Sequence, residues 1–501
     1  MKLVRRILPF VVIVVAALLL LYVPDIGPER YTDLATFFRV EMKRQSYAGY
    51  AVAAVEKGSV LYVDAFGVDG NGKPLTVDSP LFVGGLSKSF AGMAALSLAR
   101  ERKLDLERPV REYLPWFGFA AGGADGSIVG AGGDVTLRHL LSHTSGVSDA
   151  SFDDAHELAP DLEAAARSLA AARPVAPPGR AFHYLNTDYQ VLGLVMQKAT
   201  GKEYPEIVGQ RVFGPLGMKR TSARPEGLGV AVPVGNGSFF GAALPRGVPL
   251  YPFAAPSSSV VSTASDLGLY LAFLAAPERQ KRSPLPPSAV RSLYAPLVPG
   301  IGYGYGWYIQ GEGQAAVVSH DGSVDGFSSR VELWPASRGG VAIVAAQNSI
   351  LQSLVAMPAL VDGARRIMAD GSADRPFPLG RLYILLAVVA AVHVTSLALQ
   401  TGGAIGWAKA VKDRAEATGA VGPMLAAAFL SWAGIALRVG IAVFAPRLLS
   451  LGFGRIVTWK TAFLLEPGLA AWCASACFFG ILRNSARLAW LRGAHAFRRL
   501  R

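Results

Sequence analysis

Cysteine is nearly absent from this chain of 501 residues. The two that occur, Cys473 and Cys477, lie four residues apart in an apolar stretch near the C-terminus, where we expect small apolar core residues. No cysteine precedes them, so the disulfide framework that holds many small secreted domains is excluded for the rest of the chain. The stability of the large central segment must therefore come from a hydrophobic core.

Motifs for nucleotide and metal binding are also missing. The glycine-rich stretch 120–134 has no following Lys-Ser or Lys-Thr pair, and the alternating glycines of 302–307 lack both GxGxxG spacing and a βαβ context. His139 and His143 have the four-residue spacing of a zinc pair, but no glutamate lies between them to act as a base. The sequence therefore predicts neither a metal nor another cofactor.

Long hydrophobic runs are present at both ends of the chain. The first extends from Ile7 to Val23, and three more extend over Leu382–Leu399, Val421–Phe444 and Val457–Leu482. Each is close to the ~20 residues that a helix needs to cross a bilayer. They predict one N-terminal and three C-terminal transmembrane helices. No Ala-x-Ala site follows the first run, which favours a retained signal anchor over the alternative, a cleaved signal peptide.

The net charge of +13 is distributed in a way that indicates membrane topology. The residues before the first run, the loop between the first two C-terminal runs and the segment after Leu482 contribute three, one and six net positive charges. All three lie on one side of a four-span protein, which the positive-inside rule makes the cytoplasmic side. We therefore expect a lipid bilayer as partner, and no nucleic acid. The predicted domains are an anchor (1–24), an exported domain (25–379), three membrane helices (380–482) and a basic cytoplasmic tail (483–501).

Three ionisable residues interrupt the C-terminal runs. Lys460 and Glu466 are best explained as residues near the outer membrane interface. Arg438 lies well inside the second run, and a charge in that position is by default a functional indication. An ion pair between Arg438 and Glu466 across the helices is the alternative to an interfacial Glu466.

The exported segment shows the patterns of an α+β domain. Residues 47–70 alternate apolar and polar positions around "EKG", which predicts a β-hairpin. Helical spacing extends over Ser87–Arg102 and over Asp188–Thr200, the latter ended by Gly201. Near the end of the segment, residues 328–348 predict two strands around a Gly-Gly turn. Strands at both ends with helices between them predict one antiparallel sheet whose terminal strands meet.

Seven sequence blocks in the exported segment carry a family resemblance. The first is "LFVGGLSKSF", at residues 81–90. The others are "VTLRHLLSHTSGV", "YLNTDYQVLGLVMQKATGK", "VFGPLGMKRTSA", "SSSVVSTASDLGLYLAFL", "YGYGWYI" and "SHDGSVDGFSS". In this order they resemble the blocks of serine β-lactamases, penicillin-binding DD-peptidases and related esterases, most of all the class C-like branch. The resemblance covers roughly residues 35 to 365 and implies an antiparallel sheet flanked by helices, with a helical subdomain.

The resemblance also implies roles for single positions. In such enzymes a Ser-x-x-Lys helix start places the nucleophile and the lysine on one helix face, because residues three apart are neighbours. Two backbone N–H groups receive the oxyanion, here those of Gly85 and Ser323. The implied catalytic positions are Gly85 (the nucleophile position), Lys88 and Tyr184. The implied substrate-binding residues are Asn186, His320, Gly322 and Ser323.

Position 85 departs from the family, because glycine stands where the serine nucleophile should be. Neither Ser87 nor Ser89 replaces it, since neighbouring residues on a helix point about 100° apart and neither shares the face of Lys88. A nucleophile elbow Gly-x-Ser-x-Gly also fails, because residue 89 is serine.

Three functions are compatible with this departure. The first is a homologue that has lost covalent catalysis but still binds a carbonyl-bearing ligand such as a D-amino-acid peptide, an ester or a β-lactam. The second is an active hydrolase in which Tyr184 and Lys88 activate a water molecule in the space that serine leaves. The third is an altered form of an active enzyme with serine at position 85. The membrane helices and the resemblance together imply a multi-pass protein of the bacterial inner membrane, with its main domain in the periplasm. Cell-wall peptides and acyl-D-amino-acid prodrugs are the implied substrate classes.

Overall fold

The fold is given by a computed structural model, which describes residues 12–13, 15, 27–118, 135–148, 159–169, 172–247, 251–280, 283–312, 315–453 and 458–492. The chain forms two compact units. One contains residues 26–237 and 243–379, and the other contains residues 1–25, 238–242 and 380–501.

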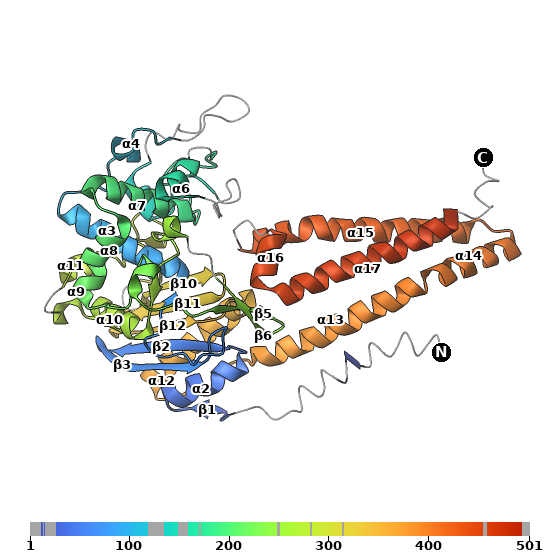
Figure 1. The fold of residues 1–501 in the computed structure, drawn as a ribbon, viewed down its shortest axis with the longest axis horizontal. Coiled ribbons are helices and arrows are strands. Elements are labelled where there is room, and N and C mark those ends of the chain that lie inside the picture. The colour runs from blue at the N-terminus through green and yellow to red at the C-terminus, as the bar shows by residue number, and fades with distance from the viewer. Residues whose placement is uncertain are drawn as a thin grey trace. The chain divides into compact units, whose positions relative to one another are not determined.

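A seven-stranded antiparallel sheet is the centre of the first unit (Figure 1). Its strand order is β3-β2-β12-β11-β10-β9-β8. The strands are β2 (Gly49–Glu56), β3 (Ser59–Gly67), β8 (Tyr303–Gly304), β9 (Trp307–Gln310), β10 (Val317–Val324), β11 (Phe327–Trp334) and β12 (Gly339–Ala345). The first long strand, β2, pairs with the last, β12, with Ala53 opposite Ala342. This confirms the prediction of an α+β domain whose terminal strands meet.

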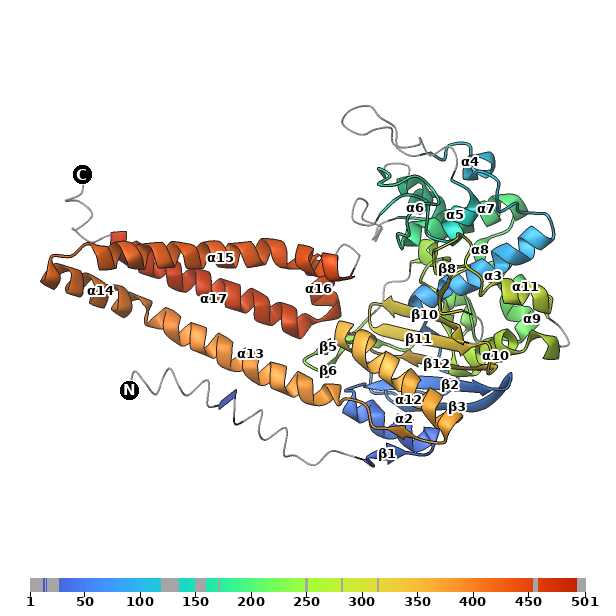
Figure 2. The same ribbon diagram turned by 180° about the vertical axis from the view of Figure 1, so that it is seen from behind.

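Helices cover both faces of this sheet. Tyr50 of β2 donates its hydroxyl to the carbonyl of Phe38 in α2 (Leu34–Arg44), and α2 packs with α12 (Met357–Asp370). Ala53, three residues along the same strand, instead lies against Gly268 of α10 (Ala264–Ala275). Because side chains alternate between the faces of a strand, α2 and α12 lie on one face and α10 lies on the other (Figure 2).

The two helices that bring residues to the site match the predicted patterns closely. Helix α3 extends over Ser87–Arg100 and is buried along most of its length. Helix α7 extends over Asn186–Thr200 and ends at Gly201, whose φ of 66° is the left-handed conformation that glycine adopts at little cost. Both contribute to a large apolar core beside the sheet.

The predicted Gly-Gly turn is wrong, because these two glycines belong to strand β12. Gly340 pairs with Val55, and a side chain there would press on the carbonyl oxygen of Glu332, 2.8 Å away. The chain instead reverses over residues 335–338, where Arg338 takes a φ of 53°. The glycines thus permit close strand packing rather than reversal.

The second unit consists of helices. These are α13 (Leu379–Gly402), α14 (Ala404–Thr418), α15 (Gly422–Phe453), α16 (Trp459–Leu465) and α17 (Pro467–Arg492). The segment between the first two predicted C-terminal spans is therefore helical, and it forms α14. Helices α15 and α17 pack along each other (Figure 1).

The prediction of four spans is met only in part. Among the described residues, the two segments Leu379–Gly402 and Gly422–Arg447 are long and apolar enough to cross a membrane, a test that the core helices of soluble proteins also pass. The third predicted C-terminal span is not one helix, since α16 ends at Leu465, Glu466 caps it, and α17 begins at Pro467. The N-terminal run lies outside the described residues except for residues 12, 13 and 15.

Candidate active site

The candidate site lies where a tight turn meets the edge of strand β10. Gly85 belongs to the 3₁₀ turn Gly84–Leu86, which leads directly into α3. Gly84 has a φ of 54°, and a Cβ on it would lie 2.5 Å from the backbone nitrogen of Ser323. Only glycine allows this approach, so the amide group of Ser323 lies against the turn that carries Gly85.

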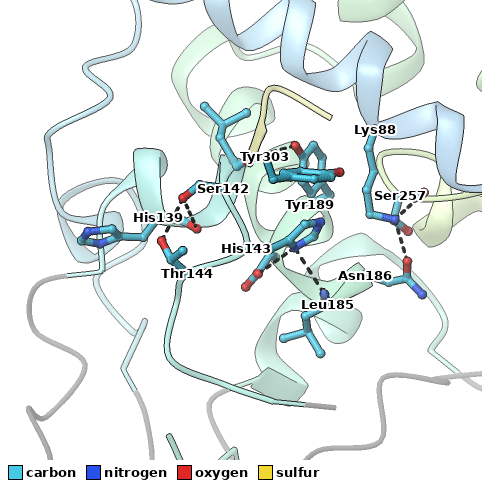
Figure 3. A network of polar contacts seen from close by, with 12 residues as sticks. Lys88, His139, Ser142, His143, Thr144, Leu185, Asn186, Tyr189, Ser257 and Tyr303 are labelled. Carbon is cyan, nitrogen blue, oxygen red and sulfur yellow. Dashed lines mark hydrogen bonds and ion pairs between the residues drawn. The ribbon is translucent and has the colours of Figure 1, made fainter. Parts of the chain in front are cut away.

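Lys88 is fully buried in the first turn of α3. Its Nζ donates hydrogen bonds to Asn186 Oδ1 at 2.7 Å and to the carbonyl oxygen of Ser257 at 2.9 Å (Figure 3). The same Nζ lies 4.4 Å from the centroid of the Tyr184 ring, within the range of a cation–π contact. The structure thus brings together three residues that the sequence singled out: Lys88 of α3, Asn186 of α7 and Tyr184 of the loop before α7. Ser257 was not among them, because its carbonyl is a backbone group that no side-chain pattern reveals.

His320 is buried, and its hydrogen bonds and its lowered pKa together indicate a neutral imidazole. Its Nδ1 lies 2.6 Å from the carbonyl oxygen of Asp321, which can only accept, so Nδ1 carries the proton. Its Nε2 lies 3.2 Å from the Tyr303 hydroxyl and accepts from it. Burial, and then the charge of Lys88, lower the pKa of His320 to about 3. His320 therefore has no acidic proton to deliver at neutral pH.

The position beside Gly85 where a serine side chain would lie is already occupied. A Cβ on Gly85 would lie 2.7 Å from His320 Cε1 and 2.8 Å from both the Tyr184 hydroxyl and the Asp321 carbonyl oxygen. Contacts below 3.0 Å force a neighbour to move, and the Asp321 oxygen is part of the β10 backbone. A serine side chain at this position would therefore require these neighbours to shift.

The two nearby serines have structural hydrogen bonds. Ser87 Oγ donates to the Gly84 carbonyl at 2.7 Å and accepts from the Val260 amide at 3.1 Å. Ser89 Oγ donates to the Leu86 carbonyl at 2.8 Å and accepts from the Tyr270 hydroxyl. Both hydroxyls hold the turn and helix in place.

The segment His320-Asp321-Gly322 of β10 packs closely against the turn that carries Gly85. A Cβ on Gly322 would lie 2.0 Å from the Val83 carbonyl oxygen, so this position also requires glycine. Asp321 directs its carboxylate away to Arg330, at 2.8 Å, and burial raises the pKa of this carboxyl. Ser323 accepts a hydrogen bond from Asn348 Nδ2 at 2.9 Å. These contacts from Arg330 and Asn348 hold this end of β10 in place.

A layer of buried aromatic and polar groups behind the site was not predicted. His143 lies with its Nδ1 3.1 Å from Asp188 Oδ2, and both side chains are fully buried. Its ring contacts Tyr184, with centroids 4.6 Å apart, and Tyr303, at 4.9 Å. Tyr308 stacks on the other side of Tyr184 at 6.3 Å. The signal in the sequence was the aromatic run "GYGYGWYI", which the block assignment explained without giving its residues a role.

His139 and His143 do not form a metal pair. The ring of His139 accepts a hydrogen bond from the Thr136 amide at the start of helix α5 (Leu137–Leu141), whereas His143 points to Asp188 (Figure 3). Among the described residues, no group of three or more His, Cys, Asp or Glu side chains is placed to hold a metal ion.

Comparison with known proteins identifies the family. The model of the family described as Beta-lactamase matches residues 34–364, more than half of the chain. The chain belongs to the beta-lactamase family. This is the family whose blocks were recognised in the sequence, and the matched range agrees with the expected one.

Individual relatives of this beta-lactamase family member are distant. Protein flp of Staphylococcus aureus (strain MW2) is 25% identical over 334 residues, which is 63% of each chain. Penicillin-binding protein 4* of Bacillus subtilis (strain 168) is 28% identical over 197 residues, covering 38% of this chain and 40% of the relative. The chain thus spans less than two thirds of the length of the curated relatives that it matches.

Solved structures show the same fold. The octameric penicillin-binding protein homologue from Pyrococcus abyssi matches with a TM-score of 0.57 and 24% identity, over 67% of this chain and 77% of that one. D-alanine carboxypeptidase AmpC from Burkholderia cenocepacia matches with a TM-score of 0.52 and 22% identity, over 65% of this chain and 95% of that one. These likenesses establish the fold of the first unit.

Proposed function

We propose that this protein is a membrane-anchored beta-lactamase family member that binds a carbonyl-bearing ligand without forming an acyl-enzyme. The observation that carries the proposal is the filled position beside Gly85. Tyr184, His320 and the β10 backbone lie where the serine side chain would be. Neither nearby serine is free to attack in its place, since both hydroxyls are engaged.

The groups that would bind such a ligand remain. Gly85 keeps its backbone N–H, and the Ser323 amide lies against the same turn, which supports a pair of donors for a carbonyl oxygen. Lys88 places a buried ammonium group beneath Tyr184. D-amino-acid peptides, esters and β-lactams are the ligand classes that this arrangement suits.

Binding and acylation can be measured separately on the full-length protein in detergent. We expect calorimetry to detect binding of an acyl-D-amino-acid peptide, and mass spectrometry to find no adduct after incubation with an activated β-lactam. Lys88→Met should weaken binding, whereas Lys57→Met, in the β2–β3 turn far along the sheet edge, should not. An adduct on the unmodified protein at any residue of the site would overturn the proposal, as would the absence of binding to all three ligand classes.

A hydrolase is the second candidate, favoured by the contact between Lys88 and the Tyr184 ring. In this case Tyr184 activates a water and hydrolyses cell-wall peptides or acyl-D-amino-acid prodrugs directly. Turnover that disappears in Tyr184→Phe would establish it. In the related case of a parent enzyme with serine at 85, the Gly85→Ser variant should gain a β-lactam adduct that the unmodified protein lacks.

We also propose that the second unit is a multi-pass anchor in the bacterial inner membrane, with the first unit in the periplasm. Large apolar side chains on its helices are exposed, among them Leu399 at 72% and Phe429 at 71%. Soluble proteins rarely expose apolar surface of this kind in continuous patches. Supporting evidence also comes from the positive charges of the C-terminal segment. A fluorescent protein fused after Arg501 should fluoresce in the cytoplasm, and the protein should stay in the membrane fraction at alkaline pH.

A further inference from the structure

Helices α15 and α17 carry a group of neighbouring polar side chains, which we call the arginine cluster. It consists of Ser431, Arg438, Arg483, Asn484 and Arg487. The close approaches of two glycines show how the helices align. A Cβ on Gly434 would lie 2.4 Å from Asn484 Nδ2, and a Cβ on Gly480 would lie 1.7 Å from Arg438 Nε. Positions 434 and 484 therefore face each other, as do 438 and 480, and this antiparallel register brings Ser431 level with Arg487.

Several donors in the arginine cluster have no acceptor. Arg483 Nε, Arg487 Nε, Asn484 Nδ2 and Ser431 Oγ are buried and have no hydrogen-bond partner among the described residues. Ser431 and Asn484 are each only 2% exposed. A buried polar group without a partner is destabilising, so native structures rarely leave several in one place. These donors are therefore available to an acceptor from outside the chain.

An anion is the acceptor that suits these donors best. Neither α15 nor α17 contains an aspartate or a glutamate. Arg483 is repelled by Arg438, and Arg487 is repelled by Arg483. The acceptors that these arginines have are neutral: the Gly434 carbonyl for Arg438, the Gln400 amide for Arg483. The guanidinium of Arg487 lies 4.1 Å from the ring centroid of Trp407.

We propose that the arginine cluster binds the phosphate group of an anionic phospholipid. Guanidinium groups match the geometry of phosphate oxygens, and the Asn484 and Ser431 donors supply further hydrogen bonds. The residues next to the cluster in sequence are exposed and apolar, with Leu430 66%, Leu437 63% and Leu482 46% exposed, and they suit the acyl chains. Basic pockets between membrane helices are a known type of lipid head-group site. The inference rests on the proposal that these helices lie in a membrane.

The test uses the full-length protein in a neutral detergent, with phosphatidylglycerol or phosphatidylcholine added. We expect phosphatidylglycerol to raise the thermal midpoint and to remain bound in native mass spectrometry, and phosphatidylcholine to do neither. Arg483→Gln and Arg487→Gln should each weaken the effect about fivefold, the size expected for one basic side chain at an anionic surface. Arg414→Gln removes an exposed arginine of α14 and is the matched control, with no change expected.

Two further measurements, one on the Ser431→Ala variant and one with inorganic phosphate, complete the test. Ser431→Ala removes one buried donor without disturbing packing, so it should leave the lipid-free protein as stable as before, or more so, and still weaken phosphatidylglycerol binding. Inorganic phosphate in place of lipid shows whether the phosphate group alone is recognised. Equal phosphatidylglycerol binding by the cluster variants and by Arg414→Gln would overturn the inference. Absence of the unmodified protein from the membrane fraction would instead overturn the anchoring proposal, so the two failures are distinguishable.

Discussion

At position 85, the difference between glycine and serine is one hydroxymethyl group, and the surrounding atoms have taken its space. Tyr184 reaches this space from the loop before α7 and His320 reaches it from β10, two positions more than a hundred residues apart in sequence. The sequence predicted that Lys88, Tyr184 and Asn186 belong to one site, and the structure places them in contact. It could not predict that Tyr184, His320 and the β10 backbone crowd the space beside Gly85, because such crowding depends on distances between distant elements.

The filled space makes a stability prediction for Gly85→Ala. The added Cβ would press on the Tyr184 hydroxyl, His320 Cε1 and the Asp321 carbonyl, and such overpacking costs about 1–3 kcal/mol. We expect the free energy of unfolding to fall by that amount in chemical denaturation. Gly227→Ala is the control, since a Cβ there meets nothing within 4 Å and should leave stability nearly unchanged. A Gly85→Ala variant as stable as the control would show that the space is open.

His320 makes a prediction for pH dependence. Its pKa is about 3 in the folded protein and about 6.5 when unfolded, so between these values the unfolded chain binds the proton and the folded one does not. Stability should therefore fall as pH falls through this window, by up to about 1.4 kcal/mol per pH unit from this residue alone. His320→Gln should show a shallower decline between pH 6 and pH 4 in urea denaturation. Parallel curves for the two proteins would contradict the assignment of a buried neutral imidazole.

At the scale of elements, local patterns predicted the helices well and the turns and breaks less well. Helices α3 and α7 match their predicted ranges to within two residues, because apolar spacing and the terminal Gly201 act locally. The third apolar run was predicted as one span although Pro467 stands inside it. Proline lacks the amide that a continuing helix needs, and α17 begins there. The signal was in the sequence, but the length and hydrophobicity of the run outweighed it.

A buried ion pair lies within helix α2, between Glu41 and Arg44, and it leads to a third prediction. The fully buried Glu41 carboxylate accepts hydrogen bonds from Tyr31 at 2.7 Å, Arg44 at 2.6 Å and Gln45 at 2.9 Å. Glu41→Gln removes the negative charge that faces the buried Arg44 guanidinium, and breaking a buried ion pair typically costs about 3–5 kcal/mol. We expect a loss of that size in urea denaturation. Glu278→Gln, which breaks an exposed ion pair with Arg338, should cost less than about 1 kcal/mol.

At the scale of the whole molecule, the family match and the compact unit end at different places. The match ends at residue 364, within α12, but the first unit continues to Leu379. The added residues are tied to the start of the unit. Strand β13 (Ala373–Asp374) pairs with β1 (Arg30–Tyr31), and the side chains of Arg44 and Gln45 donate to the carbonyls of Pro376 and Phe377.

This difference gives a prediction for truncated proteins. A chain of residues 26–379 keeps the β1–β13 pair and the hydrogen bond from the Leu379 amide to Gln45, so it should fold as a soluble protein. A chain of residues 26–365 loses the Pro376 and Phe377 carbonyls that accept hydrogen bonds from Arg44 and Gln45, and each lost bond costs roughly 1–3 kcal/mol. It also cuts α12, which packs against α2 and the sheet. We expect a sharp, cooperative thermal transition for the longer chain and aggregation or a strongly lowered midpoint for the shorter one. Equal midpoints would show that the boundary lies at the end of the family match, and that residues 366–379 belong to the linker rather than to the unit.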